Sequence, residues 1–166
     1  MNYNDPYPNF DRDQVKGKLF MLFNVEDQRK EKALEIGAAG KLFNIVVNDE
    51  RTSKILIERE TFGKAVTIVP LNKIQFRQLK SETINEAKKI ASRHGGSAEL
   101  AVNLVKFDDQ VANAVKYAFN DFLVCSNDTI AKEIAFHKNR LYSCKCVTLD
   151  GDVFESGTLT GGASKN

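Results

Sequence analysis

Three glycines, Gly157, Gly161 and Gly162, fall within six residues at the end of the run CVTLDGDVFESGTLTGG. Ordering glycine this dense costs backbone entropy, so the run must serve a purpose that needs bare backbone. Three such purposes are a left-handed turn, a phosphate group held by backbone amides, or the close approach of a second protein backbone. The rest of the chain has to show which one applies.

A phosphate-binding loop is the first chemistry to test, because Gly37–Ala38–Ala39–Gly40–Lys41 superficially resembles one. That loop needs four residues between its glycines, and a Ser or Thr directly after the lysine. Here two residues separate the glycines, and Leu42 follows the lysine. The favoured interpretation is the end of a helix before a strand.

The three cysteines are the second candidate. Cys144 and Cys146 are two residues apart on an expected strand, so they face the same side, and Cys125 is expected on a neighbouring strand. A zinc site would need a fourth ligand, for which only His94 and His137 exist. Free cysteine is usually buried, so the sequence favours core packing and predicts no metal site and no cofactor.

No catalytic centre is predicted. The chain has no Ser–His–Asp or Cys–His arrangement in a nucleophile-elbow context. His137, beside Lys138, is expected to cap the end of a helix, and Asp150 and Asp152 flank a glycine in a typical hairpin turn. The alternative that stays open is a small α/β nucleotide-binding or enzymatic domain that uses the glycine-rich C-terminal stretch.

Basic residues provide the last candidate chemistry, contact with nucleic acid. The formal net charge is only +2, so such contact would depend on where the charges lie. Lysines on a helix are usually just solvated, and phosphate contact requires several cations on one surface. The candidate nucleic-acid contacts are Lys64, Lys73, Arg77, Lys138, Arg140 and Lys145.

The composition indicates an ordinary globular protein, with 166 residues, 42% hydrophobic and 28% charged. This length suits one domain or two small subdomains that share a core. No apolar run approaches the ~20 residues of a membrane span, and the start lacks a signal-peptide pattern. An odd number of cysteines without scaffold spacing predicts reduced thiols and an intracellular protein. The chain also reads as a piece excised from a longer one.

Strands and helices are expected to alternate. Expected strands cover residues 15–25, 42–47, 66–69, 100–105, 122–125 and 141–149. Expected helices cover residues 26–39, 53–60, 84–94, 108–119 and 129–138. This order predicts an α/β fold with partly parallel pairing.

Local signals give the expected ends of these elements. Gly37 and Gly40 are expected to end the first helix, Thr52 to cap the second, and Thr83 with Glu86 to form a capping box before the third. Residues 71–80 are a connector between the two halves. The expected division is an irregular leading segment 1–14, subdomain I with the connector at 15–80, subdomain II at 81–163 and a tail at 164–166.

Four runs in order carry a family resemblance: VKGKLFMLFNVED, ALEIGAAGKLFNIVVNDE, VTIVPLNKI and VTLDGDVFESGTLTGGA. Together they resemble the hinge domain of SMC (structural maintenance of chromosomes) proteins, with the greatest likeness to condensin members. The resemblance extends from about Val15 to Ala163. It implies a mixed α/β fold of two subdomains, each with a small sheet and packed helices.

The resemblance also implies a function. SMC hinges lie between the two arms of a long antiparallel coiled coil and associate in pairs through glycine-bearing strands. The implied partner is the hinge of a second SMC subunit, as a heterodimer, with a homodimer as the alternative for the isolated piece. Weak DNA binding, a role in chromosome condensation and segregation, a nuclear location and no membrane association follow. The ATPase heads lie elsewhere in such proteins, so this piece is not expected to be an enzyme.

Gly40, Gly157, Gly161 and Gly162 match the positions of the family's interface glycines. The resemblance therefore implies a dimer interface of these four residues with Lys41 and Leu42, which follow Gly40. The sequence departs from the family pattern at two places that matter below. Ala39 stands where the first glycine of a Gly–Gly pair is usual. Lys64–Ala65 stands where an Arg–Arg pair is common.

Overall fold

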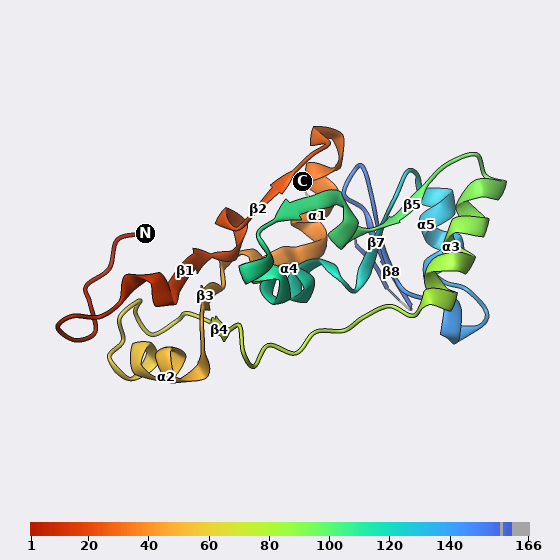
Figure 1. The fold of residues 1–166 in the computed structure, drawn as a ribbon. Coiled ribbons are helices and arrows are strands. Elements are labelled where there is room, and N and C mark those ends of the chain that lie inside the picture. Colours follow the sequence, from red (N-terminus) through yellow and green to blue (C-terminus); the bar gives the residue numbers. More distant parts are fainter. Residues whose placement is uncertain (157, 161–166) are drawn as a thin grey trace.

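The computed structural model describes residues 1–156, together with the backbone of residues 158–160. The molecule is elongated (Figure 1). A small sheet and helix α2 (Glu50–Glu58) lie near one end, helices α3 (Ser81–Arg93) and α5 (Asp128–Ala135) lie at the other, and helices α1 (Glu31–Ala38) and α4 (Ala112–Phe119) lie between them.

The small sheet has the order β1-β3-β4. Strand β3 (Ile45–Val47) pairs antiparallel with β1 (Val15–Lys18) and parallel with β4 (Ile68–Pro70). Its β-branched residues suit a strand, and Ile45, Val47 and Ile68 pack with Leu56 of α2 in a local core. Helix α2 starts after Asp49, whose carboxylate accepts a 2.8 Å hydrogen bond from the Thr52 amide.

The larger sheet has the order β10-β9-β8-β7-β5. Its strands are β5 (Ala98–Leu100), β7 (Phe122–Cys125), β8 (Lys145–Thr148), β9 (Val153–Glu155) and β10 (Thr158–Thr160). Strand β7 pairs parallel with β8, and the other neighbours are antiparallel. Helices α3 and α5 cover the face of this sheet that carries Leu123, Cys125 and Cys146. Helices α1 and α4 pack on the other face, against Phe122, Val124 and Val147. The central strands are therefore buried on both sides, which explains their continuous apolar sequence.

One core joins the two halves of the chain. Leu34 of α1 and Val46 of β3 belong to the same buried cluster as Val115 of α4 and Phe122 of β7. A further link across the halves is the antiparallel pair β2 (Phe23–Val25) and β6 (Val105–Phe107). The division at residue 80 that the sequence suggests stays a prediction, and these contacts cross it.

Of the six expected strands, five differ in extent: 42–47 shortens to β3, 66–69 shifts to β4, and the other three change more. The strand 15–25 divides into β1 and β2 around a 3-10 turn at Leu19–Met21, after an irregularity in the pairing at Gly17, whose φ is +117°. Residues 100–105 form the end of β5, a 3-10 turn at Ala101–Leu104 and the start of β6. Residues 141–149 begin in the 3-10 turn Arg140–Tyr142, and β8 starts only at Lys145.

Several helix ends also differ from expectation. The Thr83 hydroxyl donates to the carbonyl oxygen of Leu141 at 2.6 Å instead of forming a capping box, and α3 starts at Ser81. Asp49, rather than Thr52, caps α2. Gly37 lies inside α1 and does not end it. Helix α5 ends at Ala135, three residues before the expected end at 138.

Candidate functional site

The segment after α1 brings bare backbone to the surface. Helix α1 ends at Ala38, and Ala39 turns the chain with φ +51° and ψ −133° into the 3-10 turn Ala39–Phe43. Gly40 is exposed in this turn, and a β-carbon placed there would meet no atom within 4 Å. Open space beside an exposed glycine is what a docking backbone requires.

The two residues after Gly40 face inward. Lys41 donates from Nζ to the carbonyl oxygen of Tyr117 at 3.1 Å and lies 4.7 Å from the centre of the Tyr117 ring. Leu42 is 7% exposed and belongs to the core that joins the halves. Of these three predicted interface residues, Gly40 is therefore the one with open space beside it that a partner could occupy.

The same segment does not suit a phosphate. It follows the C-terminus of α1, where the helix dipole presents negative partial charge, whereas phosphate sites use a helix N-terminus. Lys41 is already occupied by Tyr117. The structure thus supports the helix-end interpretation of Gly37–Lys41.

The sequence-based predictions did not include an apolar surface that lies beside Gly40. Phe20, Met21 and Phe43, named here the aromatic patch, are 45%, 55% and 66% exposed. The rings of Phe20 and Phe43 stand edge to face with centroids 6.0 Å apart. They lie on the two contacting 3-10 turns Leu19–Met21 and Ala39–Phe43. Exposed aromatic residues that gather in this way are typical of interaction surfaces.

Strand β10 lies at an edge of the larger sheet. Its backbone pairs with β9 on one side, with Leu159 opposite Phe154. In the part of the chain that the structure describes, no strand pairs with its other side. Such an edge can accept a partner strand. The predicted interface residues Gly157, Gly161 and Gly162 lie outside the described residues.

Three of the predicted nucleic-acid residues come together. Arg77, Arg140 and Lys145 line a hollow of about 390 Å³, named here the basic hollow. The other residues that line it are Leu79, Asp121, Ser143, Cys144, Glu155 and Ser156. The hollow is thus cationic on balance, although two carboxylates also face it. This grouping could not be inferred from sequence, because the connector contributes Arg77 from a distant position.

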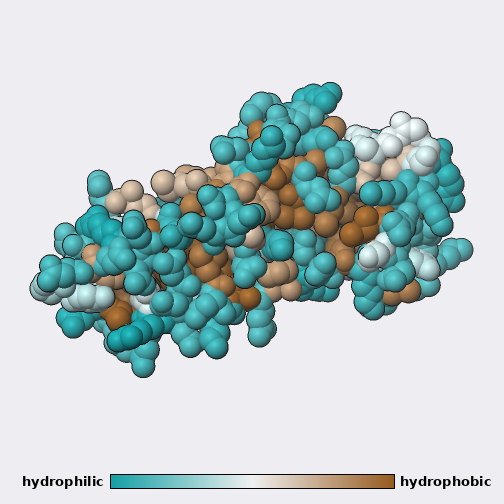
Figure 2. All heavy atoms as spheres, viewed as in Figure 1, coloured by the Kyte–Doolittle hydropathy of each residue, from teal (hydrophilic) through white to brown (hydrophobic). Residues whose placement is uncertain are grey.

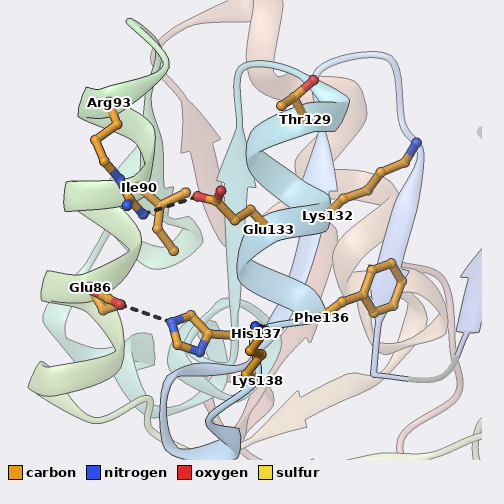
Figure 3. A pocket seen from close by; sticks show the side chains of 9 residues that line it. All are labelled: Glu86, Ile90, Arg93, Thr129, Lys132, Glu133, Phe136, His137 and Lys138. Atoms are coloured by element: carbon orange, nitrogen blue, oxygen red, sulfur yellow. Dashed lines mark hydrogen bonds and ion pairs between the residues drawn. The ribbon is translucent and has the colours of Figure 1, made fainter.

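The remaining three predicted basic residues lie elsewhere. Lys64 is exposed in the loop before β4, and Lys73 lies 3.9 Å from the Glu50 carboxylate. Lys138 lines a separate hollow of about 650 Å³ at α3 and α5 (Figure 3). The six residues therefore do not form one surface.

The hollow at α3 and α5 also shows what His137 does. Its ring points toward α3, and its Nε2 lies 2.9 Å from the Glu86 carboxylate (Figure 3). Its Nδ1 accepts a 3.0 Å hydrogen bond from the Asn139 amide, which places the proton on Nε2. Glu133 likewise points to Arg93, 3.2 Å away. The expected helix-capping role of His137 is wrong, and its ring connects α5 to α3 instead.

The other sequence candidates are structural. Cys125 and Cys146 are buried between the larger sheet and α3 and α5, as expected from core packing. Within the described residues, no group of three or more His, Cys, Asp or Glu side chains is arranged to hold a metal ion. Asp150 and Gly151 form the expected hairpin turn between β8 and β9, with Gly151 at φ +90°.

A family model described as "SMC proteins Flexible Hinge Domain" matches residues 12–135. The chain belongs to the SMC hinge family. Structural maintenance of chromosomes protein 2 of Saccharomyces cerevisiae is 41% identical over 165 residues, which cover 98% of this chain and 14% of the relative. The protein of the same name from Schizosaccharomyces pombe is 43% identical over 97% of this chain and 14% of its own length. The human protein of that name is 38% identical over 97% of this chain and 13% of its own length.

Solved SMC hinges share the fold. An asymmetric dimer of the Geobacillus stearothermophilus SMC hinge domain gives a TM-score of 0.74 at 26% identity, covering 95% of this chain and 67% of that chain. The Pyrococcus furiosus hinge domain gives 0.66 at 27% identity, covering 90% and 72%. The expected family resemblance, including its likeness to the condensin subunit SMC two, and the mixed α/β hinge fold are confirmed.

These relatives are much longer than this chain, which spans about one seventh of their length, 14% for the yeast proteins. A hinge fragment is not itself a catalytic domain, in agreement with the sequence prediction. Among the residues that the structure describes, none of the helices has the length and apolar character to cross a bilayer.

Proposed function

We propose that this chain is the dimerisation hinge of a condensin-type SMC protein. It would bind the hinge of a second, different SMC subunit and so join two coiled-coil arms. The aromatic patch beside Gly40 is the observation that supports this most, because three large apolar side chains are left in solvent next to open backbone. The G. stearothermophilus hinge, which has the same fold, is described as a dimer.

Two surfaces would take part. The patch supplies the apolar contact, since aromatic side chains commonly contribute most of the binding energy at an interface. The β10 edge, together with the glycines that follow it in sequence, supplies backbone for strand addition. In a pseudo-symmetric pair, the Gly40 surface of one hinge would meet the β10 edge of the other.

The test uses light scattering on the chain alone and mixed with the hinge of a candidate second SMC subunit. The double variant Phe20→Ser and Phe43→Ser is expected to stay folded and to lose association at least about tenfold. Phe136→Ser is the matched control, because Phe136 is 46% exposed but lies after α5, away from the patch. Unchanged association of the double variant would refute the role of the patch.

The glycines outside the described residues can be tested in the same assay. Bulky substitutions at Gly161 and Gly162 are expected to give a folded chain that no longer associates, because side chains there would hold a partner backbone away. Association equal to that of the unmodified chain would refute the strand-addition part of the proposal.

Weak DNA binding is a second proposed activity, supported by the basic hollow. Arg77→Gln with Arg140→Gln is expected to weaken binding of single-stranded oligonucleotides and to reduce its salt dependence. Lys64→Gln with Lys73→Gln removes the same charge elsewhere and serves as the control. Binding that is absent, or equal at two salt concentrations, would remove this proposal.

The wider roles rest on the long relatives. We propose that the whole protein is an ATPase of chromosome condensation and segregation that acts on nuclear chromosomes, and that this part needs no cofactor. A thermal-shift titration with ATP distinguishes the hinge proposal from the nucleotide-binding alternative, because a ligand that binds the native state raises the melting temperature of the protein. The hinge proposal predicts no saturable shift, and a clear one would favour the alternative.

A further inference from the structure

The wall of the basic hollow carries a thiol. Cys144 lies directly before β8 and lines the hollow with Arg77, Arg140 and Lys145. Its side chain is half-buried, whereas Cys125 and Cys146 are each 0% exposed. Cys144 is thus the one cysteine of the three that a dissolved reagent can reach.

Cys146, the buried neighbour of Cys144, is a poor nucleophile. The Cys146 thiol donates to the carbonyl oxygen of Cys144 at 3.6 Å. Burial, with hydrogen bonds to the thiols of Cys125 and Cys144, raises the pKa of Cys146 well above its usual range. Because the thiolate is the nucleophile, Cys146 stays protonated and does not attack a group attached to Cys144. Cys146 is therefore not expected to displace an adduct from Cys144.

The charges around Cys144 favour an anionic reagent. Arg77 and Arg140 are exposed, and neither guanidinium forms an ion pair within the described part of the chain. Guanidinium groups bind carboxylates through paired hydrogen bonds. Lys145 also lines the hollow and adds a positive charge, while its Nζ donates to the carbonyl oxygen of Gly37 at 2.8 Å. Asp121 and Glu155 offset part of this field, which leaves one excess positive charge among the side chains that line the hollow.

We propose that Cys144 is a modification site for small anionic disulfides such as glutathione disulfide, whose carboxylates bind Arg77 and Arg140. The Cys144 thiolate attacks one sulfur of the reagent and forms a new S–S bond. The S–S bond of the reagent breaks, and its electron pair leaves with the second sulfur, which takes up the proton that the Cys144 thiol released. The reagent is itself the oxidant, so no other one is needed.

The experiment treats the 166-residue chain with glutathione disulfide, which is anionic, or with cystamine, a small cationic disulfide. Intact and peptide mass spectrometry then give the rate and the position of the adduct. We expect a single mixed disulfide at Cys144, formed faster with glutathione disulfide, and none in Cys144→Ser. Addition at Cys125 or Cys146, or an internal disulfide in place of the adduct, would overturn the proposal.

The charge dependence is tested with Arg77→Gln and Arg140→Gln together. This variant is expected to slow the reaction with glutathione disulfide by at least about threefold and to leave that with cystamine equal or faster. Lys64→Gln with Lys73→Gln, which lowers the net charge equally but away from the hollow, is expected to change neither rate. Equal slowing by both pairs of substitutions, or by neither, would show that the hollow does not select the reagent.

Discussion

The ring of Phe122 fills the space that a β-carbon on residue 37 would need, so α1 can lie against β7 because residue 37 is glycine. Phe122 is 0% exposed, and Gly37 is on the buried face of α1. Lys145 of β8 completes the contact, since its Nζ reaches the carbonyl oxygen of Gly37 at 2.8 Å and lies 5.2 Å from the centre of the Phe122 ring.

Gly37→Ala is expected to destabilise the fold by about 1–3 kcal/mol, because overpacking against Phe122 outweighs the gain in helix propensity. Denaturant unfolding followed by circular dichroism measures this. Gly40→Ala, at an exposed position with open space, is the control and should change stability by less than about 0.5 kcal/mol. Equal effects at the two positions would contradict the packing account.

Ala39→Gly is expected to stabilise the chain by about 1 kcal/mol, since Ala39 has φ +51°, a conformation that glycine adopts without strain. Ala38→Gly, inside α1, is the matched control and should destabilise by about 1 kcal/mol. The melting temperatures of the two variants should therefore move in opposite directions.

Asp49→Ala is expected to cost about 1 kcal/mol at neutral pH through loss of the α2 cap, whereas Asp49→Asn keeps the cap. The hydrogen bond from the Thr52 amide lowers the pKa of Asp49. A lowered pKa in the folded state gives stability that is complete above the ordinary aspartate pKa and is lost as the pH falls through the folded value. The unmodified chain should thus lose stability relative to Asp49→Asn below about pH 4, and parallel pH profiles would exclude this linkage.

Lys145→Met is expected to destabilise the fold by about 1–2 kcal/mol, because the carbonyl group of Gly37 loses its charged donor. Lys138→Met, at an exposed position, is the control and should change stability by less than about 0.5 kcal/mol. Chemical denaturation provides the comparison. A smaller loss of unfolding free energy for Lys145→Met than for Lys138→Met would show that this hydrogen bond does not stabilise the fold.

Local sequence signals predicted the elements that depend on near neighbours. Strand β7 has the expected bounds, and the Asp150–Gly151 hairpin forms where the turn residues indicate. The errors arise where distant residues decide. Thr83 bonds to Leu141 rather than to its own helix, and the expected strand 15–25 breaks so that β2 can pair with β6.

The candidate site was predicted only in part for the same reason. Gly40 is on the surface as expected, but Leu42 was assigned to the interface and packs in the core. Phe20 was expected within the strand 15–25, and its exposure follows from a 3-10 turn that apolar periodicity cannot show. Apolar atoms on the viewed face gather mainly over the middle of the molecule, where the halves join (Figure 2).

The core that Leu34 and Val46 share with Val115 and Phe122 has a mechanical consequence. Pulling the halves apart would expose this entire cluster to water at once, so the chain should resist load as one unit and rupture in a single step.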